Sequence, residues 1–343
     1  MADDSVDHLS VMLEGSMWSE PCSTDAQHPR YSQYKNANRQ EKSQEKRRLD
    51  YLEHQKNARF DYVNHARKLA MNEFDASDDD EAVCKMESDD GMGEIMGKKH
   101  KSQRHRYADE LMLSEWLVDI PEELSTDWIC VLCPVGKRCL VVASRGVTSS
   151  YSKSGYLMKQ FSSFLPGGNR SSKGHYTLLD CIFVLSTKTF FCLDIIAWND
   201  VSCAENEFDC RLFLLNSRIS ENENFRESSK QFPFRFVCLP YCRSSKEDME
   251  ELVRIPVDFQ LDGILFYHSK VRYQRGRCPL VGWLKPWMLP EILSVSVPSE
   301  LMDGHASDLG NSQKFIDEFN AKYHHIPPQK SVVDDIKLLR QDE

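Results

Sequence analysis

Our interpretation of the fold starts from one stretch of the sequence, Pro279-Leu280-Val281-Gly282-Trp283-Leu284-Lys285-Pro286. An apolar run that ends at a proline predicts a short strand. Gly282 in its middle marks a bulge or the close approach of another group. Trp283 and Lys285 place a flat π-face beside a cation, which is what a protein needs to hold a nucleobase and its phosphates. Such stacking is worth about 1–3 kcal/mol per base. The alternative is that Trp283 is a core tryptophan.

The residues around this stretch, from Tyr107 to about Ser296, have the composition of a globular domain. Leu111–Leu117 and Pro290–Leu293 have the pattern of helices. Apolar runs typical of strands recur between segments rich in Gly, Asn and Ser, and they are Trp128–Cys133, Cys139–Ala143, Tyr176–Leu185, Phe190–Ile196, Arg211–Leu215, Phe234–Leu239, Ile264–Tyr267 and Leu280–Leu284. We therefore expect an α+β domain over residues 107–296, dominated by antiparallel β-sheet.

Composition limits the classes of function. The chain has 343 residues, 41% of them hydrophobic, and a formal net charge of −10. This charge argues against a protein that binds nucleic acid by bulk electrostatics. No apolar run is long enough to span a bilayer, and the N-terminus lacks the basic and apolar regions of a signal peptide. With 12 cysteines and no export signal, we expect a reducing cytosolic or nuclear setting.

Two close cysteine pairs raise the question of a metal site. Cys130 and Cys133 have the Cys-x-x-Cys spacing, and Cys238 and Cys242 form a second pair. Zinc is one interpretation. However, Cys130 and Cys133 lie in a strand-like run, where residues three apart point to opposite faces. Buried free thiols are therefore favoured over zinc.

The first 29 residues are polar, with a few large apolar side chains. Leu9, Leu13 and Met17 repeat at intervals of four, which predicts a short amphipathic helix. A helix this short cannot bury its apolar face alone. The segment is therefore either disordered or made to dock into a partner's groove. A random spacing of apolar residues in a tail explains the pattern equally well.

Residues 30–72 differ sharply because basic residues dominate them. From about Gln40 to Ala70 there is no Gly or Pro, so we expect a long basic helix with too little apolar surface to belong to a core. The basic residues are Arg30, Lys35, Arg39, Lys42, Lys46, Arg47, Arg48, Lys56, Arg59, Arg67 and Lys68. A solvated surface helix is one interpretation; an anionic protein partner, RNA or a membrane surface are the others, and scattered acids disfavour the membrane.

The remaining segments predict disorder. Residues 73–106 combine an acidic run with a basic patch and few large apolar residues, so we expect a disordered linker. Residues 297–343 are polar, with one weak helical segment at Gln313–Tyr323, and we expect a mostly disordered tail.

Three short segments resemble, in order, the motifs of nucleotidyltransferases that build RNA caps and join nucleic acids. They are Cys133-Pro-Val-Gly-Lys-Arg138, Leu261-Asp-Gly-Ile-Leu-Phe266 and Gly282-Trp-Leu-Lys-Pro286. The resemblance implies a fold of the nucleotidyltransferase type. In those enzymes the first motif is KxDGxR, whose lysine bonds to the nucleotide. Here the lysine position is Cys133 and the aspartate position is Val135. Cysteine cannot form the lysine phosphoramidate, so a nucleotide pocket without enzymatic activity, cofactor or metal is expected.

Longer segments resemble the snurportin family, import adaptors for spliceosomal small nuclear ribonucleoproteins. They cover about residues 28–70 and 107–296 and include Leu111-Met-Leu-Ser-Glu-Trp116, Tyr151-Ser-Lys-Ser-Gly155, Leu165-Pro-Gly-Gly-Asn-Arg170 and Asp61-Tyr-Val-Asn-His-Ala-Arg67. The resemblance implies a receptor for the 2,2,7-trimethylguanosine cap. It implies that Trp283 stacks on the methylated base, that Trp116 helps to recognise it, and that polar contacts come from Ser114, Arg138 and Lys153. Cys133 and Lys285, at the matched motif positions, complete the expected cap site.

The family resemblance also implies the protein partners. The basic segment would bind importin-β, and Leu9, Leu13 and Met17 would join the cap domain in contacting a leucine-signal exportin with its GTPase. The protein would then shuttle between nucleus and cytoplasm and bind capped small nuclear RNA. Two alternatives remain from other classes: an active guanylyltransferase or ligase, which predicts a covalent nucleotide adduct, and a general RNA-binding protein with a basic arm, whose affinity would survive removal of the cap.

Overall fold

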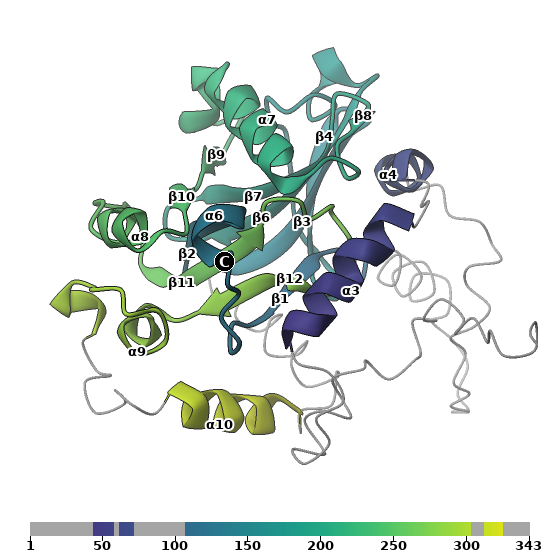
Figure 1. Cartoon of the computed structure of the whole chain (residues 1–343). Coiled ribbons are helices and arrows are strands. Elements are labelled where there is room, and N and C mark those ends of the chain that lie inside the picture. Colours follow the sequence, from purple (N-terminus) through teal and green to yellow (C-terminus); the bar gives the residue numbers. More distant parts are fainter. Residues whose placement is uncertain (1–43, 58–61, 72–106, 303–311, 325–343) are drawn as a thin grey trace, which may run out of the picture. The chain divides into compact units, whose positions relative to one another are not determined.

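A computed structural model describes residues 44–57, 62–71, 107–302 and 312–324 (Figure 1). Several sequence predictions fall outside these residues: the N-terminal segment with Leu9, Leu13 and Met17, the basic residues Arg30, Lys35, Arg39, Lys42 and Arg59, and the linker over residues 73–106. Among the helices that are described, none is both long and apolar enough to cross a membrane.

Two β-sheets form the domain. The first is five-stranded, in the order β1-β12-β11-β2-β10, and consists of β1 (Met112–Trp116), β2 (Trp128–Pro134), β10 (Tyr241–Arg243), β11 (Leu261–His268) and β12 (Gly276–Leu284). The second is seven-stranded, in the order β5-β4-β3-β6-β7-β8 with β9 beside β7, and consists of β3 (Lys137–Ser144), β4 (Val147–Ser152), β5 (Leu157–Phe161), β6 (Tyr176–Val184), β7 (Thr189–Trp198), β8 (Val201–Ser202) and β9 (Arg235–Cys238). The β1–β12 and β7–β9 pairs are parallel and the other pairs are antiparallel, which confirms the predicted α+β fold.

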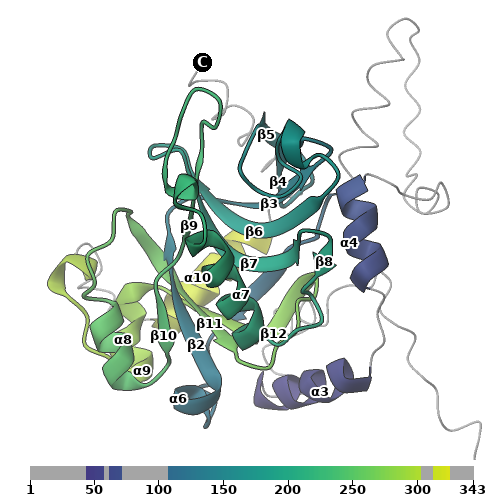
Figure 2. The ribbon, with the colours of Figure 1, turned by 90° about the horizontal axis from the view of Figure 1, so that it is seen from above.

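Helices cover the sheets from several sides (Figure 2). The α-helices are α3 (Gln44–Asn57), α4 (Tyr62–Met71), α6 (Leu124–Asp127), α7 (Phe208–Ser220), α8 (Lys246–Leu252), α9 (Leu289–Leu293) and α10 (Ser312–His324). The 3-10 helices are η2 (Arg170–Ser172), η3 (Glu223–Arg226), η4 (Pro286–Met288) and η5 (Ser299–Leu301). Helix α3 lies along β12, α4 contacts β3, β6 and β8, and α7 packs on β7.

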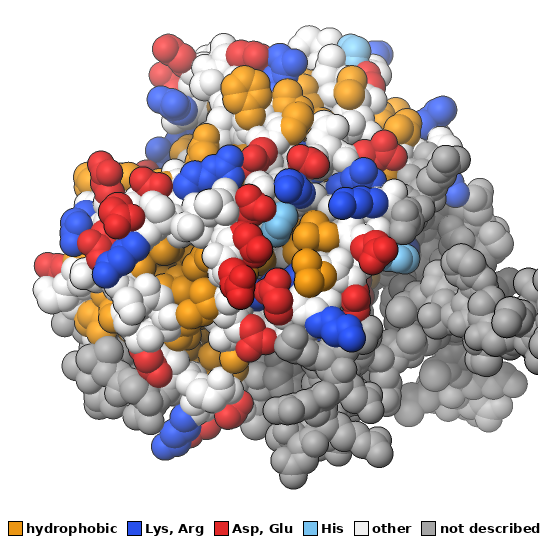
Figure 3. Space-filling model, in the orientation of Figure 1, with side chains coloured by type: hydrophobic (Ala, Val, Ile, Leu, Met, Phe, Trp, Pro, Cys, Tyr) orange, Lys and Arg blue, Asp and Glu red, His pale blue; other side chains and the backbone are white. Residues whose placement is uncertain are grey.

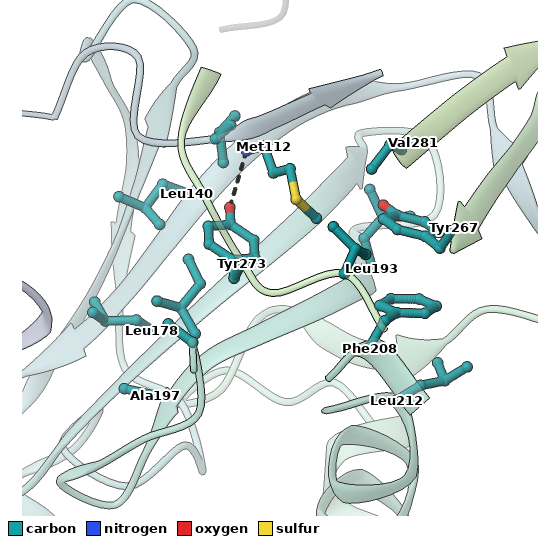
Figure 4. Close-up of a cluster of buried hydrophobic side chains, with 14 of the residues drawn as sticks. Met112, Leu140, Leu178, Leu193, Ala197, Phe208, Leu212, Tyr267, Tyr273 and Val281 are labelled. Atoms are coloured by element: carbon teal, nitrogen blue, oxygen red, sulfur yellow. Dashed lines mark hydrogen bonds between the residues drawn. The ribbon is translucent and has the colours of Figure 1, made fainter. Parts of the chain in front are cut away.

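The largest hydrophobic cluster joins side chains of both sheets (Figure 4). In its interior the backbone N–H of Met112 donates to the Tyr273 hydroxyl over 3.3 Å. A second cluster covers the other face of the five-stranded sheet, where Trp128 and Leu284 pack with residues of α8, α9 and α10. This arrangement leaves β12 with buried side chains on both faces, and it fixes the position of the stretch from Pro279 to Pro286.

Two predicted elements have the wrong type. Leu111–Leu117 was expected to be helical but forms β1, because pairing with β12 outweighs the helical pattern of a short apolar run. Arg211–Leu215 was expected to be a strand but lies in α7. The buried residues of α7 are Phe208, Arg211, Leu212, Leu215 and Ile219, a helical spacing that becomes clear only over the longer window.

Helices form in both the N-terminal basic segment and the C-terminal segment. Within the described residues, the predicted basic helix corresponds to α3 and α4. The expectation of too little apolar surface for a core is wrong for α4, because Ala66 and Leu69 are each 1% exposed within the cluster between the sheets. The helical segment predicted at Gln313–Tyr323 is confirmed: residues 312–324 form α10, and its Ile316 is buried.

Candidate functional site

Trp283 lies on β12, between β1 and β11, and Lys285 is close to its ring. In the sheet it is opposite Leu265 of β11 and Trp116 of β1. Its ring lies against Gly263, where a Cβ atom would come within 2.3 Å of Trp283 Cζ2. Lys285 Nζ is 5.6 Å from the centre of the Trp283 ring and 2.5 Å from Asp262 Oδ1. Trp283 is half-buried, so it is held firmly and still offers ring surface for stacking.

Arg138 begins β3 and is oriented by a buried carboxylate. Its Nε and Nη2 donate to Asp180 Oδ1 and Oδ2 over 3.0 and 2.8 Å. The Tyr273 hydroxyl also donates to Asp180 Oδ2, over 2.9 Å. Burial alone would lower the pKa of Arg138, but the Asp180 carboxylate outweighs burial and raises this pKa well above its usual value. The guanidinium therefore stays charged and fixed, and the N–H groups of Nη1 are available to a ligand.

Trp116 ends β1 and is more enclosed than Trp283. Its side chain is 8% exposed, and its ring is edge-on to Phe319 and Phe315 of α10, with centroid distances of 5.4 and 6.2 Å. Ser114, two residues earlier on the same strand, is half-buried. Trp116 is therefore next to Trp283 in the sheet, but α10 covers part of its ring.

Cys133 ends β2 and is buried, with 1% of its surface exposed. Burial raises the pKa of this thiol to about 12, so it is neither a nucleophile at neutral pH nor within reach of a ligand unless its neighbours move. Cys130 and Cys133 pack in clusters on opposite faces of the sheet, as the strand pattern predicts. Cys130 Sγ lies 3.1 Å from Cys242 Sγ. Among the residues that the structure describes, no group of three or more ligating side chains could hold a metal ion.

Lys153 lies in the turn between β4 and β5 and is exposed. Its backbone carbonyl accepts a hydrogen bond from the Asp109 N–H over 3.0 Å. This contact brings the turn to the start of β1, so a cation from the seven-stranded sheet reaches the edge of the five-stranded one.

The basic residues of α3 and α4 that belong to the predicted importin set fall into two groups. Arg47 Nη1 lies 2.9 Å from Glu115 Oε2, whose side chain is 1% exposed. Arg48 is 2% exposed; its Nη2 donates to the Asp119 carbonyl over 2.8 Å and its guanidinium lies 5.3 Å from the centre of the Trp128 ring. The other described basic residues of the predicted importin set are exposed, namely Lys46, Lys56 and Arg67. On the face drawn in Figure 3, acidic and basic side chains of the described residues are interspersed rather than gathered into one basic surface.

Sequence reasoning missed three residues that shape this site: Asp180, Tyr273 and Gly263. Asp180 is the one acid within the apolar run Tyr176–Val184. A lone acid in a buried strand requires a partner, so the run itself signalled an ion pair. Gly263 was part of a recognised motif, but its role in seating the Trp283 ring depends on the pairing of β11 with β12.

Comparisons with known proteins identify two segments of the chain. A family model described as "Snurportin1, m3G cap-binding domain" matches residues 110–286, and one described as "Snurportin1" matches residues 28–68.

Among solved structures, the ligase domain of LigD from M. tuberculosis is 16% identical with a TM-score of 0.35, over 50% of this chain and 58% of that one. A structure from a study of Lig E DNA ligases is 15% identical with a TM-score of 0.35, over 52% of this chain and 68% of that one. The Pmar-Lig_PreS3 structure is 12% identical with a TM-score of 0.38, over 52% and 46%. The chain thus spans little more than half of the first of these, and the superpositions are too loose to transfer any chemistry to it.

Proposed function

The chain belongs to the snurportin family, and on this premise we propose that it is a nuclear import adaptor. It binds the 2,2,7-trimethylguanosine cap of spliceosomal small nuclear RNAs and links the ribonucleoprotein to importin-β. The observation that carries the cap-binding part is the seating of Trp283 on Gly263, with Lys285 beside its ring. This is an aromatic platform fixed before the ligand arrives, which lowers the entropy cost of binding.

The chemistry of the cap fits such a platform. A 7-methylated guanine carries positive charge, so a tryptophan face adds a cation–π term to the stacking. The two methyl groups on N2 remove both hydrogen-bond donors from that nitrogen. A site that prefers the trimethylated base should therefore be apolar there, because an acceptor would be left unpaired. Trp116, opposite Trp283 on β1, supports this preference.

The phosphate bridge needs fixed cations. Arg138, held by Asp180 with Nη1 directed to no protein acceptor among the described residues, supplies one. Lys153 supplies a second from the β4–β5 turn. Enzymatic nucleotidyl transfer is disfavoured, because the motif lysine position is a buried thiol, Cys133, and the motif aspartate position is Val135. We therefore propose a binding protein rather than an enzyme.

The decisive experiment is a fluorescence titration with trimethylated and monomethylated cap dinucleotides. Trp283→Ala should weaken trimethylated cap binding by about 1–3 kcal/mol, with an unchanged fold by circular dichroism. Trp198→Ala, on β7 of the other sheet, is the matched control and should bind normally. Equal affinity of the native chain for both caps, or an unchanged affinity of the Trp283 variant, would contradict the proposal. Affinity for uncapped RNA equal to that for capped RNA would favour a general RNA-binding protein.

The importin part of the proposal rests on the match over residues 28–68 and on the exposed bases Lys46, Lys56 and Arg67. Importin-β is an acidic helical solenoid, and a basic helix fits its concave face. Because Arg47 and Arg48 contact the domain in this structure, α3 has to leave these contacts before all of its basic residues can reach importin-β. Reversing Lys46, Lys56 and Arg67 to Glu should abolish importin-β capture and leave cap affinity unchanged. Capture that persists would assign the basic segment another role.

The recycling part of the proposal assigns Leu9, Leu13 and Met17 to an exportin with its GTPase, which makes the protein shuttle between nucleus and cytoplasm. The spacing of these residues supports helix-in-groove docking, where a few anchors carry most of the energy. Changing Leu9 and Leu13 to Ser should strongly reduce export-complex formation with purified proteins while sparing cap and importin-β binding. Formation that is indifferent to the double change would remove this segment from the interface.

A further inference from the structure

The pairing of β1 with β12 places an arginine near the candidate cap site. Leu113 is opposite Arg277, and Trp116 is opposite Trp283. Trp283 follows Arg277 by six residues on β12, whereas their partners on β1 are only three residues apart. A strand rises about 3.3 Å per residue, so the partners on β1 are only about 10 Å apart. The extra residues of β12 are accommodated in an irregularity between the two paired segments. Arg277 is consequently about half as far from Trp283 as their separation in sequence suggests.

Lys153 approaches the same end of β1 from the other sheet. Asp109 N–H donates to the Lys153 carbonyl over 3.0 Å, and Ala108 forms an isolated bridge with Ser154. Both contacts hold the β4–β5 turn beside the residues that lead into β1. Although Lys153 is exposed, neighbouring protein atoms partly desolvate its ammonium group and lower its pKa. The charges of Arg277 and Arg138 act in the same direction, while Asp109 opposes them. Three cations from β3, the β4–β5 turn and β12 are thus close enough to influence one another.

These cations differ in how they are neutralised. Arg138 is paired with Asp180, and Arg275, two residues before Arg277, is paired with Glu110 over 3.4 Å. Within the described residues, neither Arg277 nor Lys153 makes a hydrogen bond or an ion pair through its side chain. The whole chain has 53 acidic against 43 basic residues, so two neighbouring cations whose side chains form no ion pair run against its composition. Like charges held close together destabilise the free protein and favour an anion that binds between them.

We propose that Arg277 and Lys153 form a phosphate-binding subsite for the capped RNA, beside the ring surface of Trp283. This inference rests on the proposed cap-binding function and adds Arg277 to it. Arginine suits the task because its planar guanidinium donates two parallel hydrogen bonds to one phosphate. The phosphates belong either to the bridge of the cap or to the RNA chain that follows it.

The test compares two ligands over a range of salt concentrations: trimethylated cap dinucleotide and a trimethyl-capped RNA of five nucleotides. Arg277→Ala should weaken binding about fivefold to tenfold at low salt and reduce the slope of log affinity against log salt by about 0.7, the value for one phosphate contact on a single strand. A loss with both ligands assigns Arg277 to the bridge. A loss with the longer RNA alone assigns it to the chain beyond the cap.

Two control variants separate a specific contact from general charge. Arg275→Ala removes a neighbouring, acid-paired cation and should change affinity less than twofold. Arg277→Lys keeps the charge but loses the parallel hydrogen bonds, and should recover most of the salt slope and only part of the affinity. Equal losses in the Arg275 and Arg277 variants, or an unchanged salt slope in Arg277→Ala, would overturn the subsite. These outcomes differ from failure of the proposed function, in which the native chain itself would bind neither ligand selectively.

Discussion

Arg47 of α3 donates from Nη1 to both carboxylate oxygens of Glu115, over 3.0 and 2.9 Å, and Glu115 immediately precedes Trp116. The Gln44 side chain donates to the same carboxylate over 3.4 Å and to the Trp116 carbonyl over 2.9 Å. The helix proposed to bind importin-β therefore contacts the strand that carries one of the two proposed cap-recognising tryptophans. Release of α3 would change the surroundings of Trp116, so the two proposed binding events, to importin-β and to the cap, would be physically linked.

Glu115→Gln should loosen this contact. The change removes the charge that balances Arg47 and should reduce the free energy of docking α3 by about 1–3 kcal/mol. Hydrogen exchange of the backbone amides in residues 44–57 should become faster, and importin-β affinity should rise. Glu122→Gln, an exposed neighbour on the same segment, is the control. Unchanged exchange in α3 would show that the Arg47–Glu115 pair does not hold the helix.

Gly263→Ala should disable the tryptophan platform. An added Cβ would lie 2.3 Å from Trp283 Cζ2 and 2.7 Å from the Leu284 carbonyl oxygen, and the second contact is with backbone that no side-chain rotation relieves. The Trp283 ring must move, so cap affinity should fall by about 1–3 kcal/mol, as for loss of stacking. Gly174→Ala meets no atom within 4 Å and should leave cap binding unchanged. A normal titration curve for the Gly263 variant would exclude Gly263 as the support of the ring.

Cys133 should be unreactive in the folded chain. Burial raises its pKa to about 12, above the ordinary value of 9.0. For an acid with a raised pKa, the protonated form persists as pH rises, so the thiolate is negligible at pH 8 and increases only as pH approaches 12. Alkylation at pH 8, mapped by peptide mass spectrometry, should modify the exposed Cys210 and spare Cys133. Labelling of Cys133, or a covalent adduct after incubation with GTP, would revive the enzyme alternative.

Phe315 should contribute to stability through α10. Its ring packs edge-on against Trp116 and Trp287, with centroid distances of 6.2 and 5.2 Å. Phe315→Ala should lower the free energy of unfolding by about 1–2 kcal/mol, the value expected for a partly buried aromatic side chain. Phe213→Ala, at a position that is 68% exposed on α7, should change it by less than about 0.5 kcal/mol. Equal effects in urea unfolding would mean that α10 does not pack on Trp116 in solution.

The predictions from sequence succeeded where a pattern acts locally. The strands at Trp128–Cys133, Cys139–Ala143 and Phe190–Ile196 form as predicted, because buried β-branched and aromatic runs bounded by turns have few alternatives. They failed where distant partners decide. Leu111–Leu117 becomes a strand because β12, more than 150 residues later, pairs with it.

The candidate site shows the same division. The sequence indicated Trp283, Lys285 and Arg138 through motifs. Asp180, which orients Arg138, lies on a different strand and is brought to it by the pairing of β3 with β6. The proximity of Arg277 to Trp283 depends on a register shift that no local pattern encodes.

The two tryptophans differ in how firmly their strands are held. Trp283 is in β12, which pairs with β1 on one side and β11 on the other, whereas Trp116 is in β1, an edge strand of the same sheet. Amides of an inner strand exchange with solvent mainly through global unfolding, and outer strands open in smaller, less costly fluctuations. The proposed stacking residue Trp283 is therefore held more firmly than Trp116, whose edge strand opens separately. If Trp116 senses the N2 methyl groups as proposed, changes on α3 or α10 should alter the selectivity among caps without altering the strength of stacking on Trp283.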